Sequence, residues 1–182
     1  MPLLPRNRLL HSLWIAIALM AASARADDAA EVKSLIARGD LPAALARAEA
    51  GAAAKPRDVQ LRFLQGVVLM DLQRDDAAFT VFTQLTQEYP ELPDPYNNIA
   101  LLQVRAGQLE QAQQSLESAR RGNPNHRTAR ANLGQVHLML AARAWEMVAA
   151  KGPIDPLLQG WLDAVRGLLS TPAMSAPATA PR

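Results

Sequence analysis

The sequence predicts an all-α fold made of about four stacked helix-turn-helix repeats and closed by a C-terminal capping helix. Three observations support this class. The composition is 49% hydrophobic but only 4% aromatic, without cysteine, which suits helices packed through Ala, Leu, Val and Met. Three prolines, Pro56, Pro90 and Pro124, are spaced by one constant interval of 34 residues. Apolar residues between them recur at helical spacing.

Other positions repeat at the same interval, which marks stacked supersecondary units. They are Ala44, Ala78 and Ala112; Gly66, Ala100 and Gly134; and the bulky pair Phe82 and Leu116. Small residues let two antiparallel helices approach closely. We therefore expect the second set to face Ala78 and Ala112 at helix crossings, with Phe82 and Leu116 filling the wider gap one turn further along.

Residues 1–26 are expected to be a cleaved signal peptide. Arg6 and Arg8 precede the apolar run 13–22, and Ala24 and Ala26 form an A-x-A cleavage signal. The alternative is an uncleaved anchor, although a spanning helix needs roughly 20 apolar residues. The segment holds three of the 19 basic residues and none of the 17 acidic ones, so the mature chain has 16 basic against 17 acidic residues. That balance does not favour a nucleic-acid partner.

The first two repeats are expected at about 27–58 and 59–92. In the first, Gly39 ends a helix, Asp40 caps the next one and Pro42 lies in its first turn. In the second, residues 59–73 and 75–90 form the two helices, and proline stops the second helix.

The third and fourth repeats are expected at about 93–126 and 127–153. Gly107 lies where the third repeat turns, because glycine adopts positive φ without steric cost. The fourth repeat has no turn glycine, so it either turns sharply before a short second helix at 144–151 or forms one long helix. The shortened turn is our prediction.

A capping helix is expected at 155–169, with Asp155 as its cap and Pro156 in its first turn. Its expected apolar face consists of Leu157, Trp161, Val165 and Leu168. The tail 170–182 is rich in Pro, Ala, Ser and Thr and is expected to be disordered.

The chain resembles the tetratricopeptide repeat family over about 27–151. The signature positions matched in the third repeat are Tyr96, Ile99, Ala100, Gly107, Ala112, Leu116, Ala119 and Pro124. The second repeat matches through Gly66, Ala78, Phe82 and Pro90, and the fourth through Leu133 and Gly134. The resemblance implies a right-handed α-solenoid over 27–169 whose first helices line a concave binding groove.

No residue pattern indicates catalysis, a cofactor or a metal. His126 and His137 lack a second ligand at metal spacing and are interpreted as surface or packing residues. Asp71 ends a helix. Asp75 and Asp76 can cap the next helix, and their negative charges interact favourably with the positive end of its dipole. No phosphate-binding glycine loop or nucleophile elbow is present. The protein is predicted not to be an enzyme.

The resemblance implies which side chains face the groove. They are Phe63, Val67, Asn97, Asn98, Leu101, Arg105, Ala131, Asn132 and Gln135. Asn98 and Asn132 lie one period apart and can hydrogen-bond an extended peptide, while Arg105 can pair with a carboxylate. The alternative is that asparagine is simply common at these positions in the family.

The function predicted from these observations is a periplasmic adaptor, without enzymatic activity or cofactor, that holds a peptide or helix of an envelope protein in the groove. An extracellular site is not excluded, and the sequence does not indicate an oligomeric state. The alternative is a chaperone-like holder of unfolded exported chains that uses apolar groove patches at Phe63, Val67 and Leu101.

Overall fold

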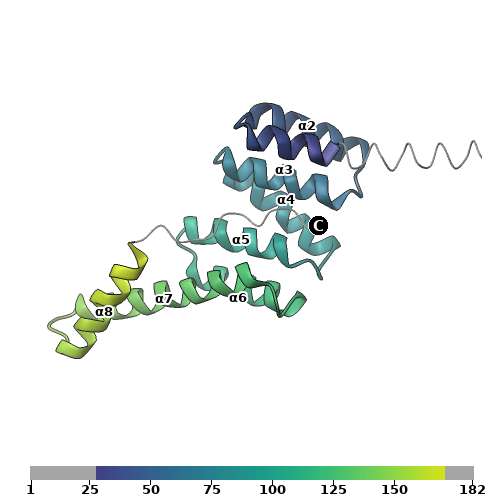
Figure 1. The fold of residues 1–182 in the computed structure, drawn as a ribbon. Coiled ribbons are helices and arrows are strands. Elements are labelled where there is room, and N and C mark those ends of the chain that lie inside the picture. Colours follow the sequence, from purple (N-terminus) through teal and green to yellow (C-terminus); the bar gives the residue numbers. More distant parts are fainter. Residues whose placement is uncertain (1–27, 171–182) are drawn as a thin grey trace, which may run out of the picture. The chain divides into compact units, whose positions relative to one another are not determined.

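The computed structural model describes residues 28–170, where every regular element is a helix (Figure 1). The predicted all-α class is confirmed. The predicted signal peptide and all but the first residue of the predicted tail lie outside the described residues. No helix in the described range is both long enough and apolar enough to cross a membrane.

A helix over 28–37 is followed by seven more. These are α2 (Leu41–Ala54), α3 (Val59–Asp71), α4 (Asp75–Glu88), α5 (Pro93–Arg105), α6 (Leu109–Gly122), α7 (Arg127–Ala149) and α8 (Pro156–Leu169). The chain divides into two compact units, Met1–Val68 and Leu69–Arg182, and the division falls inside α3.

In the N-terminal unit, the turn into α2 has the predicted chemistry. Gly39 adopts a φ of +77°, a left-handed conformation that suits glycine. The Asp40 carboxylate accepts a hydrogen bond from the Ala43 backbone N–H at 3.2 Å, and a proline lies in the first turn of α2. A cap and a pre-set proline therefore start this helix at the expected place.

The core of this unit contains small residues on α2. Ala44 and Ala48 are fully buried, and so is Leu61 on α3. A Cβ added at Gly51 would lie 3.0 Å from Leu61 Cδ1, so the missing side chain leaves the space that the leucine fills.

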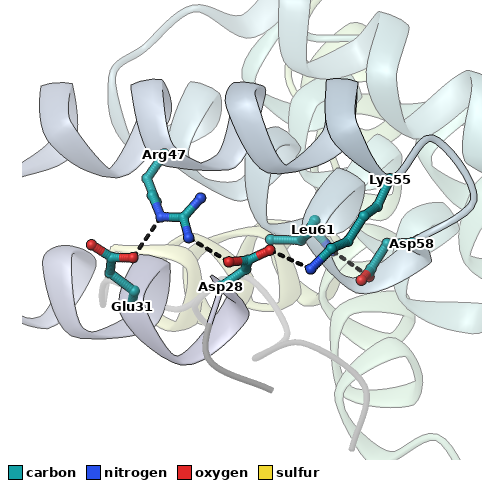
Figure 2. A network of polar contacts seen from close by, with 6 residues as sticks. All are labelled: Asp28, Glu31, Arg47, Lys55, Asp58 and Leu61. Atoms are coloured by element: carbon teal, nitrogen blue, oxygen red, sulfur yellow. Dashed lines mark hydrogen bonds and ion pairs between the residues drawn. The ribbon is translucent and has the colours of Figure 1, made fainter. Parts of the chain in front are cut away.

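A network of polar contacts ties the 28–37 helix to α2 and its C-terminal end (Figure 2). The Arg47 guanidinium donates to Asp28 and, at 2.5 Å, to Glu31 Oε2. Lys55 Nζ donates to the other Asp28 carboxylate oxygen at 2.6 Å. Asp58 then caps α3 by accepting from the Leu61 backbone N–H at 3.1 Å. Two cations therefore hold the carboxylate at the start of the first described helix.

The network predicts an acid-sensitive contribution to stability. The hydrogen bond from Lys55, together with Arg47, lowers the pKa of Asp28 below its ordinary value of 3.8. A lowered folded pKa contributes stability above pH 3.8 that is lost as the pH falls through the folded value. We expect Asp28→Asn to melt below the parent at neutral pH, and the difference to shrink as the pH falls from neutral into the acid range below about pH 4.

Circular dichroism melts across that range measure this effect. Glu49→Gln, which changes an exposed carboxylate on α2, is the matched control and should track the parent. A melting difference between Asp28→Asn and the parent that stays constant with pH would show that the ion pairs do not stabilise the unit.

In the C-terminal unit, consecutive helices pack on each other from α4 to α8, and α5 also contacts α7. The shared core of α5, α6 and α7 consists of Ala100, Ala112, Leu116, Ala119, Ala129, Leu133 and Val136. Ala100 and Ala112 are both fully buried in this cluster. The predicted close crossing of small residues is therefore confirmed for α5 and α6.

The remaining signature positions divide between core and turns. Ala78 and Phe82 on α4 are fully buried, and Gly66 is buried on α3. Tyr96 is half-buried, with its hydroxyl 3.5 Å from the Thr86 carbonyl oxygen. Pro90 and Pro124 are exposed in the connections between repeats.

In the turn between the two helices of a repeat, the residue with positive φ recurs every 34 residues. Gly107 has a φ of +74° between α5 and α6, matching Gly39. Gln73 lies midway between these glycines and has a φ of +58°, an uncommon conformation for a residue with a side chain.

Asp75 and Asp76 lie in the first turn of α4, but no side chain caps this helix. The expected capping by these two acids is therefore wrong, and their position at the positive end of the helix is right.

The predicted short turn in the fourth repeat is wrong, because α7 is one helix of 23 residues. Ala141 occupies the position 34 residues after Gly107, where a turn would begin. Alanine is the strongest helix former and disfavours the left-handed conformation that the other turns require. The helix therefore continues through this position.

The unbroken α7 also removes the crossing expected at Gly134. This glycine is exposed, and a Cβ added to it meets nothing within 4 Å. The earlier small residue Ala100 faces the second helix of its own repeat, but the fourth repeat has no such antiparallel partner. Gly134 therefore does not permit close packing, and this expectation is wrong.

Gly134→Ala is expected to raise the free energy of unfolding by about 0.5–1 kcal/mol, because alanine is the better residue in an open helical position. Gly122→Ala is the matched control of opposite sign, since its Cβ would lie 2.8 Å from the Glu91 carbonyl oxygen. Urea unfolding followed by circular dichroism measures both. A loss of stability in Gly134→Ala would contradict the open environment.

The last helix, α8, begins as predicted and packs against α7 (Figure 1). Asp155 caps it by accepting from the Leu157 backbone N–H at 2.8 Å, and Pro156 follows. The face packed on α7 centres on Leu162 and Val165. Of the four residues predicted to form its apolar face, only Val165 is buried, whereas Leu157, Trp161 and Leu168 are 52–62% exposed.

Candidate functional site

The nine side chains predicted to line the groove differ strongly in exposure. Six are buried: Phe63, Val67, Asn97, Asn98, Leu101 and Asn132. Gln135 is half-buried, while Arg105 and Ala131 are exposed. Only three of the nine are therefore at least partly open to solvent, and several of the nine come together in the C-terminal unit.

That gathering follows from helix geometry. Asn98, Leu101 and Arg105 lie at i, i+3 and i+7 and share one face of α5. Asn132 and Gln135 share one face of α7, which contacts α5 directly. We call these five residues the α5–α7 face.

A buried chain of amides crosses the α5–α7 face. Asn132 Nδ2 donates to Asn97 Oδ1 at 2.9 Å, and Asn97 Nδ2 donates to Asn98 Oδ1 at 3.4 Å. All three side chains are at most 1% exposed. Because buried amides are costly without partners, this chain fixes how α5 and α7 lie against each other.

Two atoms of these three amides have no hydrogen-bond partner among the described residues. Asn98 Nδ2 is a donor and Asn132 Oδ1 is an acceptor, and both are buried without a hydrogen bond. The sequence assigned these two asparagines to contact with a ligand, but it did not reveal that they are linked through Asn97. The structure thus gives them a packing role and leaves one donor and one acceptor unused.

Arg105 is anchored at the C-terminal end of α5. Its Nη1 donates to Asp75 Oδ1 on α4 at 2.9 Å and lies 3.4 Å from the Met70 carbonyl oxygen. The Arg105 side chain remains 46% exposed and that of Asp75 39% exposed. The guanidinium is therefore already paired within the chain, with part of its surface still open.

Two hollows flank this ion pair. One, of about 360 Å³, is lined by residues of α4 and α5 that include Phe79, Leu102 and Gln103. The other, of about 600 Å³, is lined by Met70, Asp71, Gln73 and the pair itself. Partial burial raises the pKa of Asp71, and the positive charge of Arg105 opposes that shift. Arg105 is thus the cation shared by both hollows.

His126 has a structural role that sequence reasoning missed. Its Nδ1 accepts from the Ala129 backbone N–H at 3.0 Å, which caps α7, and its Nε2 lies 2.8 Å from Asp94 Oδ1 on α5. A histidine is not among the usual capping residues, so the sequence carried no signal for this role. His137 is exposed on α7.

Within residues 28–170, no three His, Asp or Glu side chains are grouped so that they could hold a metal ion. On the α5–α7 face, the asparagine and glutamine amides can form hydrogen bonds and Arg105 can form an ion pair. Such groups recognise peptide backbones and carboxylates.

Comparisons with solved structures show the same fold. The first TPR of Spaghetti (RPAP3), bound to the HSP90 peptide SRMEEVD, aligns with a TM-score of 0.59 at 16% identity, covering 64% of this chain and 93% of that one. MamA 41-end from Desulfovibrio magneticus RS-1 aligns with a TM-score of 0.57 at 15% identity, and the alignment covers 82% of this chain and 78% of that one. The Yersinia enterocolitica type III secretion chaperone SycD was solved in complex with a peptide of the translocator YopD. It aligns with a TM-score of 0.53 at 12% identity, and the alignment covers 79% of this chain and 92% of that one.

These likenesses confirm the α-solenoid class. A search of curated proteins found no relative that matches the chain. The family model of the tetratricopeptide repeat matches residues 29–93 and 97–146, which is more than half of the chain. The chain belongs to the tetratricopeptide repeat family.

Proposed function

We propose that the protein is a non-enzymatic periplasmic adaptor that binds an extended peptide or helix of an envelope protein over the α5–α7 face. The observation that carries the proposal is the pair of unpartnered atoms, Asn98 Nδ2 and Asn132 Oδ1. A peptide backbone offers a carbonyl for the first and an N–H for the second.

The energetics favour such a partner. A buried polar group without a hydrogen bond costs about 1–3 kcal/mol, so the free protein carries this cost at both atoms. A ligand that supplies both bonds removes it. Because the two atoms are enclosed in the free structure, binding must include a local movement of the side chains that cover them.

Arg105 supplies the charge recognition in this proposal. An exposed ion pair such as the one with Asp75 contributes only about 0–1 kcal/mol. A carboxylate of the partner can therefore take the place of Asp75 at little cost and form a charge-assisted hydrogen bond.

Two structural neighbours support peptide binding by this fold. The first TPR of Spaghetti was solved with an HSP90 peptide, and SycD was solved with a peptide of YopD. The periplasmic location rests on the sequence of residues 1–26. Sequencing the N-terminus of the protein recovered from a periplasmic fraction tests that location, and the cleavage site predicts a mature chain that begins at Asp27.

Capture of envelope partners by the mature protein tests the site. Arg105→Ala is expected to lower recovery about tenfold, which corresponds to the loss of one charge-assisted hydrogen bond. Arg143→Ala is the matched control, because Arg143 forms a comparable exposed ion pair with Glu110 between α7 and α6. Equal recovery by both variants would remove the α5–α7 face from the proposal.

The chaperone-like alternative receives less support. Phe63, Val67 and Leu101, the apolar side chains assigned to it, are all buried. Suppression of a model client's aggregation at near-stoichiometric protein would nevertheless favour it over the adaptor.

A further inference from the structure

We propose that the exposed apolar side of α8 binds α8 of a second copy of this chain, forming a two-fold symmetric, concentration-dependent dimer. This surface lies at the end of the C-terminal unit and shares no residue with the α5–α7 face. The sequence predicted Leu157, Trp161 and Leu168 on one apolar face, and the structure leaves all three exposed.

The spacing of the exposed residues suits a partner helix. Leu157, Trp161, Ala164 and Leu168 are exposed and are separated by four, three and four residues. That 3-4 alternation is the pattern by which one helix pairs with another. We call these four residues the seam. The face of α8 that packs on α7 is a different one, centred on Leu162 and Val165. The helix α8 therefore has two apolar faces, and α7 covers only one of them.

The seam is complementary to itself in one orientation. When two copies of α8 lie antiparallel about the midpoint between Leu162 and Asp163, Leu157 of each copy meets Leu168 of the other. In the same register, the large Trp161 meets the small Ala164. An interface between identical subunits related by a two-fold axis requires this kind of self-complementarity.

Two glycines border the seam and leave room for a partner. Gly160 and Gly167 lie seven residues apart, and a Cβ added to either one meets nothing within 4 Å. Glycine weakens a helix, and here no neighbour in the described chain requires its small size. A second helix can approach closely along this edge of α8.

The charged side chains of α8 lie away from the seam. Arg166 pairs with Glu146 of α7 at 2.9 Å and with Asp163 at 3.8 Å. Asp163 follows Trp161 by two residues, which places it nearly opposite on the helix. Two copies can therefore meet without opposing like charges.

The apolar surface continues onto α7. The rings of Trp145 and Trp161 lie 6.1 Å apart across the two helices. Val148 follows Trp145 by one helical turn and is 51% exposed. Met147 is 59% exposed but lies two residues from Trp145, on the other side of α7.

The available area predicts a weak dimer. The exposed fractions are 62% for Leu157, 52% for Trp161, 59% for Leu168 and 51% for Val148. At about 150–250 Å² for a fully exposed large side chain, these four offer about 400 Å² per copy. Two copies thus bury about 800 Å² from these side chains, and the glycine edge and Ala164 add to it. Stable interfaces bury about 1,200–2,000 Å², so we expect a dissociation constant on the order of 10–100 µM.

Sedimentation equilibrium of the mature, exported chain between about 1 and 200 µM tests the proposal. The mean mass is expected to rise from that of one chain toward that of two. Leu157→Glu and Leu168→Lys should each weaken the dimer at least about tenfold. The double variant carrying both changes should recover the dimer, because each glutamate then faces a lysine of the other copy.

Met147→Glu is the matched control and should associate like the parent. Circular dichroism melts establish that each variant is folded. A parent that stays monomeric to about 200 µM would overturn the proposal. Failure of the double variant to recover would overturn the antiparallel pairing. Binding of the monomeric parent to phosphatidylglycerol vesicles, with a blue shift of tryptophan emission, would assign the surface to a membrane instead.

Discussion

Asn97→Leu is expected to lower the free energy of unfolding by about 2–5 kcal/mol, because it strands two buried amide atoms. Asn97 accepts from Asn132 Nδ2 and donates to Asn98 Oδ1, and neither atom has another hydrogen bond on the described chain. Each unpaired buried group costs about 1–3 kcal/mol. Urea unfolding followed by circular dichroism measures the loss.

Replacing all three asparagines by leucine is expected to recover most of that stability. Exchanging every partner of a buried polar network for an apolar group of similar shape is close to neutral, whereas removing one partner is not. A triple variant less stable than Asn97→Leu would show that the three amides do not act as one network.

The same triple variant separates folding from recognition. It lacks Asn98 Nδ2 and Asn132 Oδ1, the donor and acceptor that we propose for the peptide backbone. A variant that folds like the parent but captures less partner would assign these atoms to binding. Full capture would mean that the asparagines serve packing alone.

The second large effect is expected for Ala112→Phe, which should destabilise the C-terminal unit by roughly 1–3 kcal/mol through overpacking. Ala112 is fully buried in a cluster with Ala100 and Leu116, where α5 and α6 cross. Inserting a ring there forces the two helices apart. The melting temperature should fall by about 5–15 °C.

Gln114→Phe is the control for this substitution. It adds a ring of the same size to the same helix at an exposed position, where about 0.5 kcal/mol or less is expected. Equal melting temperatures for the two variants would place Ala112 outside a close crossing.

The repeat period made much of the fold predictable. Because the 34-residue interval places glycines at turns and small residues at crossings, the sequence located α5 and α6 and the core that Ala100 and Ala112 share. It failed where an element of the repeat was missing. At position 141 the local preference of alanine continued the helix, and Gly134 therefore lost its expected neighbour.

The candidate site was less predictable because burial depends on neighbouring repeats. The sequence identified Asn98 and Asn132 as a periodic pair, yet their burial and their link through Asn97 depend on how closely α5 and α7 pack. Similarly, the apolar spacing of α8 fitted two faces equally well. Only the position of α7 decides that Leu162 and Val165 are inside and Trp161 is outside.

The unbroken α7 has a consequence for how this protein can lengthen. An additional 34-residue unit placed between α6 and α7 would find antiparallel neighbours on both sides, because both helices already pack as members of a series. A unit added after α8 would instead follow α7 and α8, which have 23 and 14 residues and so do not have the matched lengths of a repeat's two helices. We therefore expect a tandem duplication to be better tolerated in the interior of the array than after α8.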